Sequence, residues 1–228
     1  MIITIDGFTA TGKSYVARLI ARNLSIMHIN SGLIFRALGY LLSQNYNYTA
    51  TMLQQPLEQD VTECLDPHRL RYGYDTQTQR ASVVYDGQDI TNFLMTKESD
   101  LTASLAATNA YVQYSIIDYI RAVGQAGNCV IDGRNGGSII FPHAHVKIFL
   151  TASLEIRAER WRKDRGDGFS HEQACAYINE RDMRDKQRVV APLMVPSDAH
   201  MIDTSFLTPD QVCQKILEYV KQADEQKK

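Results

Sequence analysis

The stretch GFTATGKS, residues 7–14, lies between a short apolar segment and an amphipathic one near the start of the chain. It matches the phosphate-binding pattern G-x4-G-K-S in full. The run from Ile2 to Ile5 is short and β-branched, which predicts a buried strand before the loop. Apolar residues follow Ser14 at helical spacing and predict a helix directly after the loop: Val16, Leu19, Ile20 and Leu24.

A loop in this context has a defined chemistry. Glycines let the backbone curl so that several N–H groups face one anion, and the helix N-terminus adds a partial positive charge. Lys13 can bridge the β- and γ-phosphates, and the Ser14 hydroxyl can hold Mg²⁺. A chance glycine-rich turn is the alternative, but the strand before it and the helix after it argue against that. We predict that ATP is bound by Gly7, Phe8, Thr9, Ala10, Thr11, Gly12, Lys13 and Ser14.

Composition limits the other function classes. The chain has 228 residues, of which 44% are hydrophobic and 22% charged, and this suits one soluble domain with an inserted subdomain. A net charge of −2 gives no electrostatic reason to expect nucleic acid or a membrane as partner, so anion binding must be local. The four cysteines form no CxxC pair, and MIITIDG does not resemble a signal peptide. We expect a cytoplasmic protein with reduced thiols and small-molecule substrates.

Further apolar runs predict the core strands: residues 26–29, 129–131, 146–150 and 200–202. Helical patterns alternate with them, which predicts an α/β fold with a parallel sheet covered by helices on both faces. Thr208-Pro209-Asp210-Gln211 combines an N-cap residue, Pro at N1 and Gln at N3, and should open a final helix.

The middle of the chain differs from this pattern. Arg69 to Tyr74 and Ala81 to Tyr85 are aromatic or β-branched segments separated by a polar stretch, and they predict an inserted antiparallel hairpin. The segment DRGDG, residues 164–168, is charged and contains glycine, as expected of a mobile flap.

Arginines predict a second phosphate site, because guanidinium groups bind phosphate oxygens bidentately and stay charged. Arg36 follows the second predicted strand, and Asp132-Gly133-Arg134 follows the strand 129–131, where Asp132 can orient Mg²⁺-bound water. In RDMRDKQR, residues 181–188, one helical stripe would hold Arg181, Arg184, Asp185 and Arg188.

Each of these features has a plainer reading: a surface arginine, a structural cap and a solvated helix face with internal ion pairs. Because all of them occur together with a complete phosphate-binding loop, a phosphate-binding role is favoured over these structural roles. GTPases carry an N-K-x-D motif that this chain lacks, so the pattern favours a small phosphotransferase acting on a phosphorylated acceptor.

Longer motifs narrow this class. The segments ITIDGFTATGKS (3–14), NSGLIFR (30–36), VVYDGQDIT (83–91), IDGRNGGSIIFPHAHVKIFLTAS (131–153), ERDMRDKQRVVAPL (180–193) and MIDTS (201–205) together resemble the bacterial cytidylate kinase family. The resemblance covers essentially the whole chain. It implies a P-loop core in three parts (1–30, 114–156 and 171–228), an inserted monophosphate-binding domain (31–113) and a short lid (157–170).

The resemblance also implies the reaction ATP + CMP (or dCMP) ⇌ ADP + CDP (or dCDP) with Mg²⁺, carried out by a monomer. Lys13, Arg134, Arg181 and Arg188 would be catalytic, Arg157 and Arg160 would lie near the ATP phosphates, and Ser14 and Asp132 would hold the metal. The acceptor would contact Ser31, Phe35, Arg36, Ser104, Gln113, Asp132, Arg134, Asn135, Arg181, Asp185 and Arg188.

No general base is needed, because a phosphate with a second pKa near 6 is largely deprotonated at pH 7. Catalysis would be positioning and charge neutralisation of an in-line transfer, with Asp185 and Asp132 orienting and the lid excluding water.

Four positions depart from the family pattern. Gln113 and Met95 stand where Arg is common, Asn135 where Asp is usual, and Phe35 where Tyr is usual. A carboxylate only accepts hydrogen bonds, whereas Asn135 could accept from the cytosine amino group or donate to O4 of uracil or thymine. CMP remains the expected acceptor. A shift or relaxation towards UMP or dTMP, and a nucleotide-binding regulator without transfer activity, are the alternatives; a shikimate-type kinase would not explain the hairpin and the arginine stripe.

Overall fold

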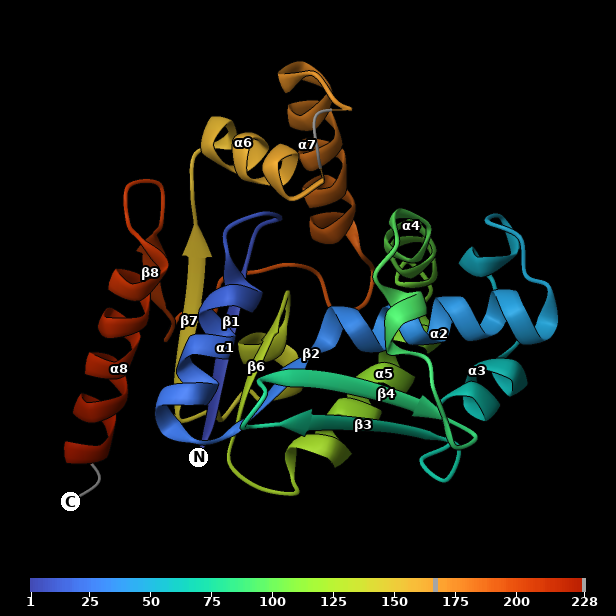
Figure 1. The fold of residues 1–228 in the computed structure, drawn as a ribbon, viewed down its shortest axis with the longest axis horizontal. Coiled ribbons are helices and arrows are strands. Elements are labelled where there is room, and N and C mark those ends of the chain that lie inside the picture. The colour runs from blue at the N-terminus through green and yellow to red at the C-terminus, as the bar shows by residue number, and fades with distance from the viewer. Residues whose placement is uncertain (166–167, 227–228) are drawn as a thin grey trace.

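The computed structural model describes residues 1–165 and 168–226, and its centre is a parallel sheet (Figure 1). The strands lie in the order β2-β6-β1-β7-β8, and all neighbouring pairs are parallel. Their bounds are Ile2–Gly7 (β1), Met27–Asn30 (β2), Cys129–Gly133 (β6), Val146–Thr151 (β7) and His200–Asp203 (β8). The five core strands predicted from the apolar runs are thereby confirmed.

Helices cover both faces of this sheet, as predicted. Alternation along β1 turns Ile3 and Ile5 towards α1 (Lys13–Leu24) and α8 (Pro209–Glu225), which share one apolar cluster with them. Ile131 of β6 faces the other cluster, built with α2 (Ser31–Tyr46) and α5 (Ala110–Gly124). Thr208 and Gln211 form the expected capping box at the start of α8.

The middle of the chain forms the predicted antiparallel hairpin, β3 (Leu70–Asp75) with β4 (Arg80–Tyr85), extended by β5 (Gln88–Asp89). The hairpin is held on the outer strand β2, because the Tyr72 hydroxyl accepts from the Asn30 N–H (2.9 Å) and donates to the His28 carbonyl (3.0 Å). Helices α3 (Glu58–Cys64) and α4 (Lys97–Ala106) and two 3₁₀ turns, Met52–Gln54 and Thr91–Leu94, complete this region. It shares an apolar cluster with β2 and β6, and its division from the core as a separate domain stays a prediction.

Helices α6 (Leu154–Arg165) and α7 (His171–Gln187) stand beyond the carboxyl ends of the strands (Figure 1). They pack on each other through a small cluster that includes Ala158, Trp161 and Ile178. Two predictions need correction here. Asp164 is helical, because α6 runs into the segment expected to be a flap, of which residues 166–167 lie outside the described chain. Arg188 is not on the helix: α7 ends at Gln187, and Arg188 is extended, with φ −56° and ψ 133°.

No helix within residues 1–165 and 168–226 is both long enough and apolar enough to cross a bilayer. All four cysteines belong to the described chain, and all are free thiols.

Candidate active site

The phosphate-binding loop begins at the carboxyl end of the central strand β1, and two of its glycines are required by geometry. Gly7 has φ +148°, and a Cβ there would lie 2.1 Å from the Leu150 carbonyl oxygen on β7. Gly12 has φ +89° and precedes α1, a left-handed conformation that disfavours other residues. The first glycine therefore permits the tight approach of β7, and the second permits the turn into the helix.

Lys13 folds back over this loop. It is buried, and its Nζ donates to the Phe8 carbonyl oxygen at 2.5 Å. Burial and, next, the nearby Arg134 guanidinium hold the pKa of Lys13 well below its usual range. A polyphosphate entering the loop would supply the missing negative charge and favour the ammonium form.

Side chains from α6 and α7 form hydrogen bonds to the backbone of the phosphate-binding loop. Asp182 Oδ1 accepts from the Thr9 N–H at 2.9 Å, and the same carboxylate forms a buried ion pair with Arg157. Arg157 also donates to the carbonyl oxygens of Ala152 (3.1 Å) and Thr9 (3.2 Å). Arg157 is thus a support of the loop, and the structure does not bring it to the cleft wall, where it was expected.

Ser14 and Asp132 provide oxygen ligands of the kind Mg²⁺ prefers. The Ser14 hydroxyl donates to Asp132 Oδ2 at 2.6 Å, and His28 Nε2 lies 2.6 Å from Asp132 Oδ1. Burial raises the pKa of Asp132, but the hydrogen bond and charge of His28, with the other polar neighbours, bring that pKa below its usual value. Among the described residues no cluster of three His, Cys, Asp or Glu forms a metal cage. A hydroxyl, one ionised carboxylate, phosphate oxygens and water fit a magnesium ion that is held mainly by its nucleotide.

The arginines expected to grip the acceptor converge on two buried carboxylates. Arg134 Nε donates to Asp185 Oδ2 at 2.7 Å, and Arg188 pairs with Oδ1 of the same residue. Burial opposes ionisation of Asp185, but Arg134 and Arg188 bring its pKa below the usual range. Arg36 Nη2 lies 2.5 Å from Asp100 Oδ1, and Arg181 Nη1 lies 3.8 Å from the same oxygen.

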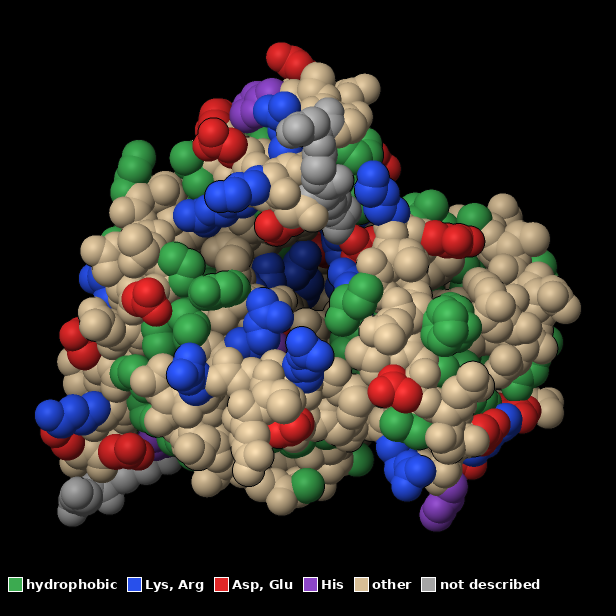
Figure 2. Space-filling model, viewed as in Figure 1, with side chains coloured by type: hydrophobic (Ala, Val, Ile, Leu, Met, Phe, Trp, Pro, Cys, Tyr) green, Lys and Arg blue, Asp and Glu red, His purple; other side chains and the backbone are tan. Residues whose placement is uncertain are grey.

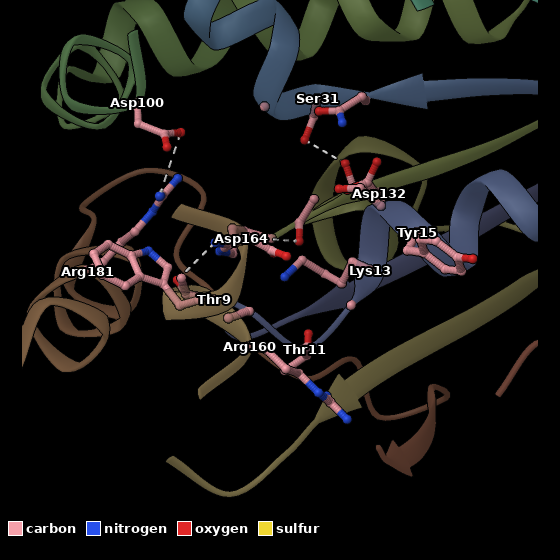
Figure 3. A pocket seen from close by; sticks show the side chains of 18 of the residues that line it. Thr9, Thr11, Lys13, Tyr15, Ser31, Asp100, Asp132, Arg160, Asp164 and Arg181 are labelled. Carbon is pink, nitrogen blue, oxygen red and sulfur yellow. Dashed lines mark hydrogen bonds and ion pairs between the residues drawn. The ribbon is translucent and has the colours of Figure 1, made fainter. Parts of the chain in front are cut away.

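These groups line one cleft of about 1000 Å³ between the loop, α2, α4 and α6–α7. Figure 2 shows Lys and Arg side chains gathered around the hollow at its mouth, and Figure 3 shows Lys13 and Asp132 facing Arg181 and Asp100 across it. The structure brings most of the expected residues to the wall: Thr9, Ala10, Thr11, Gly12, Lys13, Ser14, Ser31, Phe35, Arg36, Ser104, Asp132, Arg134, Asn135, Arg160, Arg181, Asp185 and Arg188. It does not bring Gly7, Phe8, Arg157 and Gln113 to the wall.

Of two residues expected to contact the base, Asn135 lines the cleft and Gln113 is buried away from it. Gln113 is only 1% exposed; its Nε2 donates to the Ala107 carbonyl at 2.6 Å, and within the described chain its Oε1 has no hydrogen-bond partner. Asn135 lines the cleft, and its Nδ2 donates to the Ala191 carbonyl at 3.2 Å. Met95 is exposed, with its sulfur 3.8 Å from Arg36 Nη1.

Two polar residues at or behind the site, Asp6 and Thr204, lie in the segments that resemble the family but were not expected to have a role. Asp6 is buried behind the loop and accepts from the N–H groups of Gly136 (2.8 Å) and Gly137 (2.7 Å), in a π-helical turn, Gly136–Ile140, after β6. Its pKa is raised by burial despite these hydrogen bonds. Thr204, after β8, accepts from Arg160 Nη1 (2.9 Å) and donates to the Thr11 carbonyl (3.2 Å).

Comparisons with known proteins show the family to which the chain belongs. The family model for cytidylate kinase matches residues 3–222. A cytidylate kinase from Chlamydia trachomatis serovar D is 38% identical over 218 residues, covering 95% of this chain and 96% of that protein. One from Chlamydia felis is 37% identical over 222 residues, covering 96% and 98%.

Among solved structures, an uncharacterized protein from Eubacterium ventriosum has the same overall fold, with a TM-score of 0.51, 13% identity and coverage of 97% of this chain and 98% of its own. The family match spans both the phosphate-binding loop and the arginine segments that meet in the cleft. This chain therefore belongs to the cytidylate kinase family and is a nucleoside-monophosphate kinase.

Proposed function

We propose that the protein transfers the γ-phosphoryl group of ATP, with Mg²⁺, directly to CMP or dCMP. The observation that carries this proposal is the presence of two separate sets of phosphate-binding groups in one cleft. Lys13 and the loop amides form one set, and the guanidinium groups held by Asp100 and Asp185 form the other. A protein that only bound ATP would have no use for the second set.

In this proposal the chain's own groups position the reactants and neutralise their charge. The loop and Lys13 hold the β- and γ-phosphates, while Arg36 and Arg181 orient the acceptor phosphate and Arg134 and Arg188 face the group in transfer. Mg²⁺, held by Ser14 and through water by Asp132, would neutralise the phosphate oxygens. One acceptor oxygen forms the new O–P bond as the bond to the bridging oxygen of ADP breaks, so no protein nucleophile is needed.

The orientation of Asn135 supports cytosine as the base. Nδ2 donates one of its two N–H groups to the Ala191 carbonyl, and we infer that the side chain turns its carbonyl oxygen, an acceptor, towards the base. The cytosine amino group donates at the corresponding position, whereas O4 of uracil or thymine is itself an acceptor. Two facing acceptors repel, so this arrangement favours CMP and dCMP over UMP and dTMP.

The test is a coupled assay for ADP formation with ATP and each of CMP, dCMP, UMP and dTMP. We expect kcat/KM for CMP or dCMP to exceed that for UMP and dTMP by at least tenfold, the discrimination that one buried hydrogen bond provides. A larger kcat/KM for UMP or dTMP would contradict the base assignment. Binding of ATP without turnover of any monophosphate would contradict the transfer reaction.

A second measurement separates direct transfer from a phosphorylated intermediate. With a chirally labelled γ-phosphoryl group, one in-line displacement inverts the configuration at phosphorus, and retention would contradict it. We further propose that the protein acts on free nucleotides, that it does so in the cytoplasm, and that it is a monomer.

A further inference from the structure

Asp100 is a carboxylate in the wall of the cleft that none of the expected functions uses. It lies on α4 and is 4% exposed. Its Oδ1 is 2.5 Å from Arg36 Nη2 and 3.8 Å from Arg181 Nη1 (Figure 3 shows the second pair). One oxygen atom therefore faces two of the guanidinium groups that line the acceptor side of the cleft.

These two arginines come from different parts of the fold. Arg36 is on α2, which packs beside α4, whereas Arg181 is on α7, on the other side of the cleft. One turn further along α4, Ser104 Oγ accepts from Arg184 Nη1 of α7 at 3.0 Å. Asp100 and Ser104 thus share one face of α4 and make two polar connections to the same face of α7.

Electrostatics gives the carboxylate a clear effect on the two arginines. Two guanidinium groups that both point at one phosphate repel each other until the phosphate arrives, and partial burial strengthens that repulsion. A carboxylate between them offsets the repulsion and forms charge-assisted hydrogen bonds with fixed directions. Burial lowers the pKa of Arg181, and Asp100 is first among the neighbours that bring it above its usual value. Each guanidinium has five N–H donors, so donors remain for a ligand beside those that face Asp100.

We propose that Asp100 is a positioning residue for the acceptor phosphate: it holds Arg36 and Arg181 at a convergent point before the monophosphate binds. This inference rests on the proposed function in taking the acceptor to be CMP. Asp100 acts through the two arginines and does not touch the reacting atoms. Its effect belongs to acceptor binding, because the contacts it prepares exist in both the ground state and the transition state.

The test is steady-state kinetics of Asp100→Asn, with Glu98→Gln as matched control. Glu98 is exposed on the same helix, and its variant makes the same charge change away from the arginines. In Asp100→Asn we expect the KM for CMP to rise about tenfold, which corresponds to about 1.4 kcal/mol. The KM for ATP should stay within twofold and kcat within threefold, and Glu98→Gln should change none of the three.

A double-mutant cycle asks whether the effect passes through the arginines. In an Arg36→Met background, Asp100→Asn should raise the KM for CMP by less than threefold, because one of the two arginines that Asp100 is proposed to position is already gone. A full tenfold effect in that background would overturn the inference. So would an unchanged or lower KM in Asp100→Asn, or equal increases for CMP and ATP.

Failure of the proposed function can be distinguished from failure of the positioning role. If the wild-type protein phosphorylates no monophosphate, the proposed function fails; if it phosphorylates CMP and Asp100→Asn leaves the KM unchanged, only the positioning role fails. If Asp100→Asn does not fold, Asp100→Glu retains the charge and moves it by one methylene. Its KM for CMP should then rise at least threefold, and an unchanged value would overturn the inference.

Discussion

We predict that Asp182→Asn destabilises the protein strongly while leaving ATP binding nearly intact. Asp182 is 6% exposed and pairs with Arg157, which is 7% exposed. The variant leaves a buried guanidinium without its counter-charge. The new amide still offers an oxygen to the Thr9 N–H, so the hydrogen bond that supports the phosphate-binding loop can persist.

The magnitude follows from what Arg157 retains. Removing one partner of a buried ion pair costs about 3–5 kcal/mol. Arg157 keeps two carbonyl acceptors and stands 5.4 Å from the Phe8 ring, so we place the loss near the lower bound, at about 3 kcal/mol. For a chain of this size about 2–4 °C of melting temperature corresponds to each kcal/mol, which gives a decrease of about 6–12 °C.

Thermal unfolding followed by circular dichroism measures this decrease, with Glu180→Gln as control, an exposed charge on the same helix. The control should change the melting temperature by about 2 °C or less, as exposed substitutions do. The paired variant Arg157→Met/Asp182→Leu should recover at least half of the loss, because it removes both charges together. A decrease below about 3 °C for Asp182→Asn, or a KM for ATP raised more than threefold, would refute the reasoning.

Three further outcomes follow from the same contacts. Ser14→Ala removes the hydroxyl expected on the metal, and a Mg²⁺ titration of activity should show a half-saturating concentration raised at least tenfold; an unchanged titration would contradict that role. The pKa values of Asp132 and Asp185 lie below their usual values in the folded state, so the stability they contribute is present above about pH 4 and lost as the pH falls through the folded values. Urea unfolding between pH 6 and pH 3 checks this, and Asp185→Asn should have a shallower acid limb than the wild type. Gly7→Ala places a methyl group against the Leu150 carbonyl and should lower stability by about 3 kcal/mol or more, so that a melting temperature within about 3 °C of wild type would contradict the steric argument.

The strands were predictable because burial on both faces of a parallel sheet demands runs of apolar, often β-branched residues. Their carboxyl ends were predicted too short. Asp132 and Gly133 pair with Ile5 and Asp6 of β1, although neither residue type favours a strand. Here hydrogen bonds to the neighbouring strand β1 hold both residues in the extended conformation. Residue propensities do not include the effect of a neighbouring strand.

The site was predictable where function requires a fixed local spacing, as in the phosphate-binding loop. It was not predictable where partners meet through the fold. Asp182 supports a loop 173 residues earlier in the chain, and Asp100 pairs with an arginine 64 residues away. In the sequence these carboxylates resemble ordinary polar positions of surface helices.

Gln113 shows the opposite case, a residue expected at the base that the structure places elsewhere. It follows the buried phase of α5, with Ile116, Ile117 and Ile120 three, four and seven positions later. That phase turns its amide towards the Ala107 carbonyl and away from the cleft. A glutamine is short and uncharged, so it can be buried there. An arginine at the same position would need a partner for its charge.

The electrostatics of the cleft reconcile a slightly acidic protein with two polyanionic ligands. Among the described residues, nine Lys and Arg side chains line the cleft (Lys13, Arg18, Arg36, Lys97, Arg134, Arg160, Lys163, Arg181 and Arg188) against four carboxylates (Asp100, Asp132, Asp164 and Asp185), although the whole chain has a net charge of −2. Three of those carboxylates are buried, and each is bonded to a group expected to meet a phosphate or its metal. We expect Asp100 and Asp185 to restrict the rotamers of their arginine partners before any ligand arrives, so that less conformational entropy is lost on binding. A cleft with the same arginines and no buried aspartates would be more positive, but its cations would repel one another and bind phosphate with less directional control.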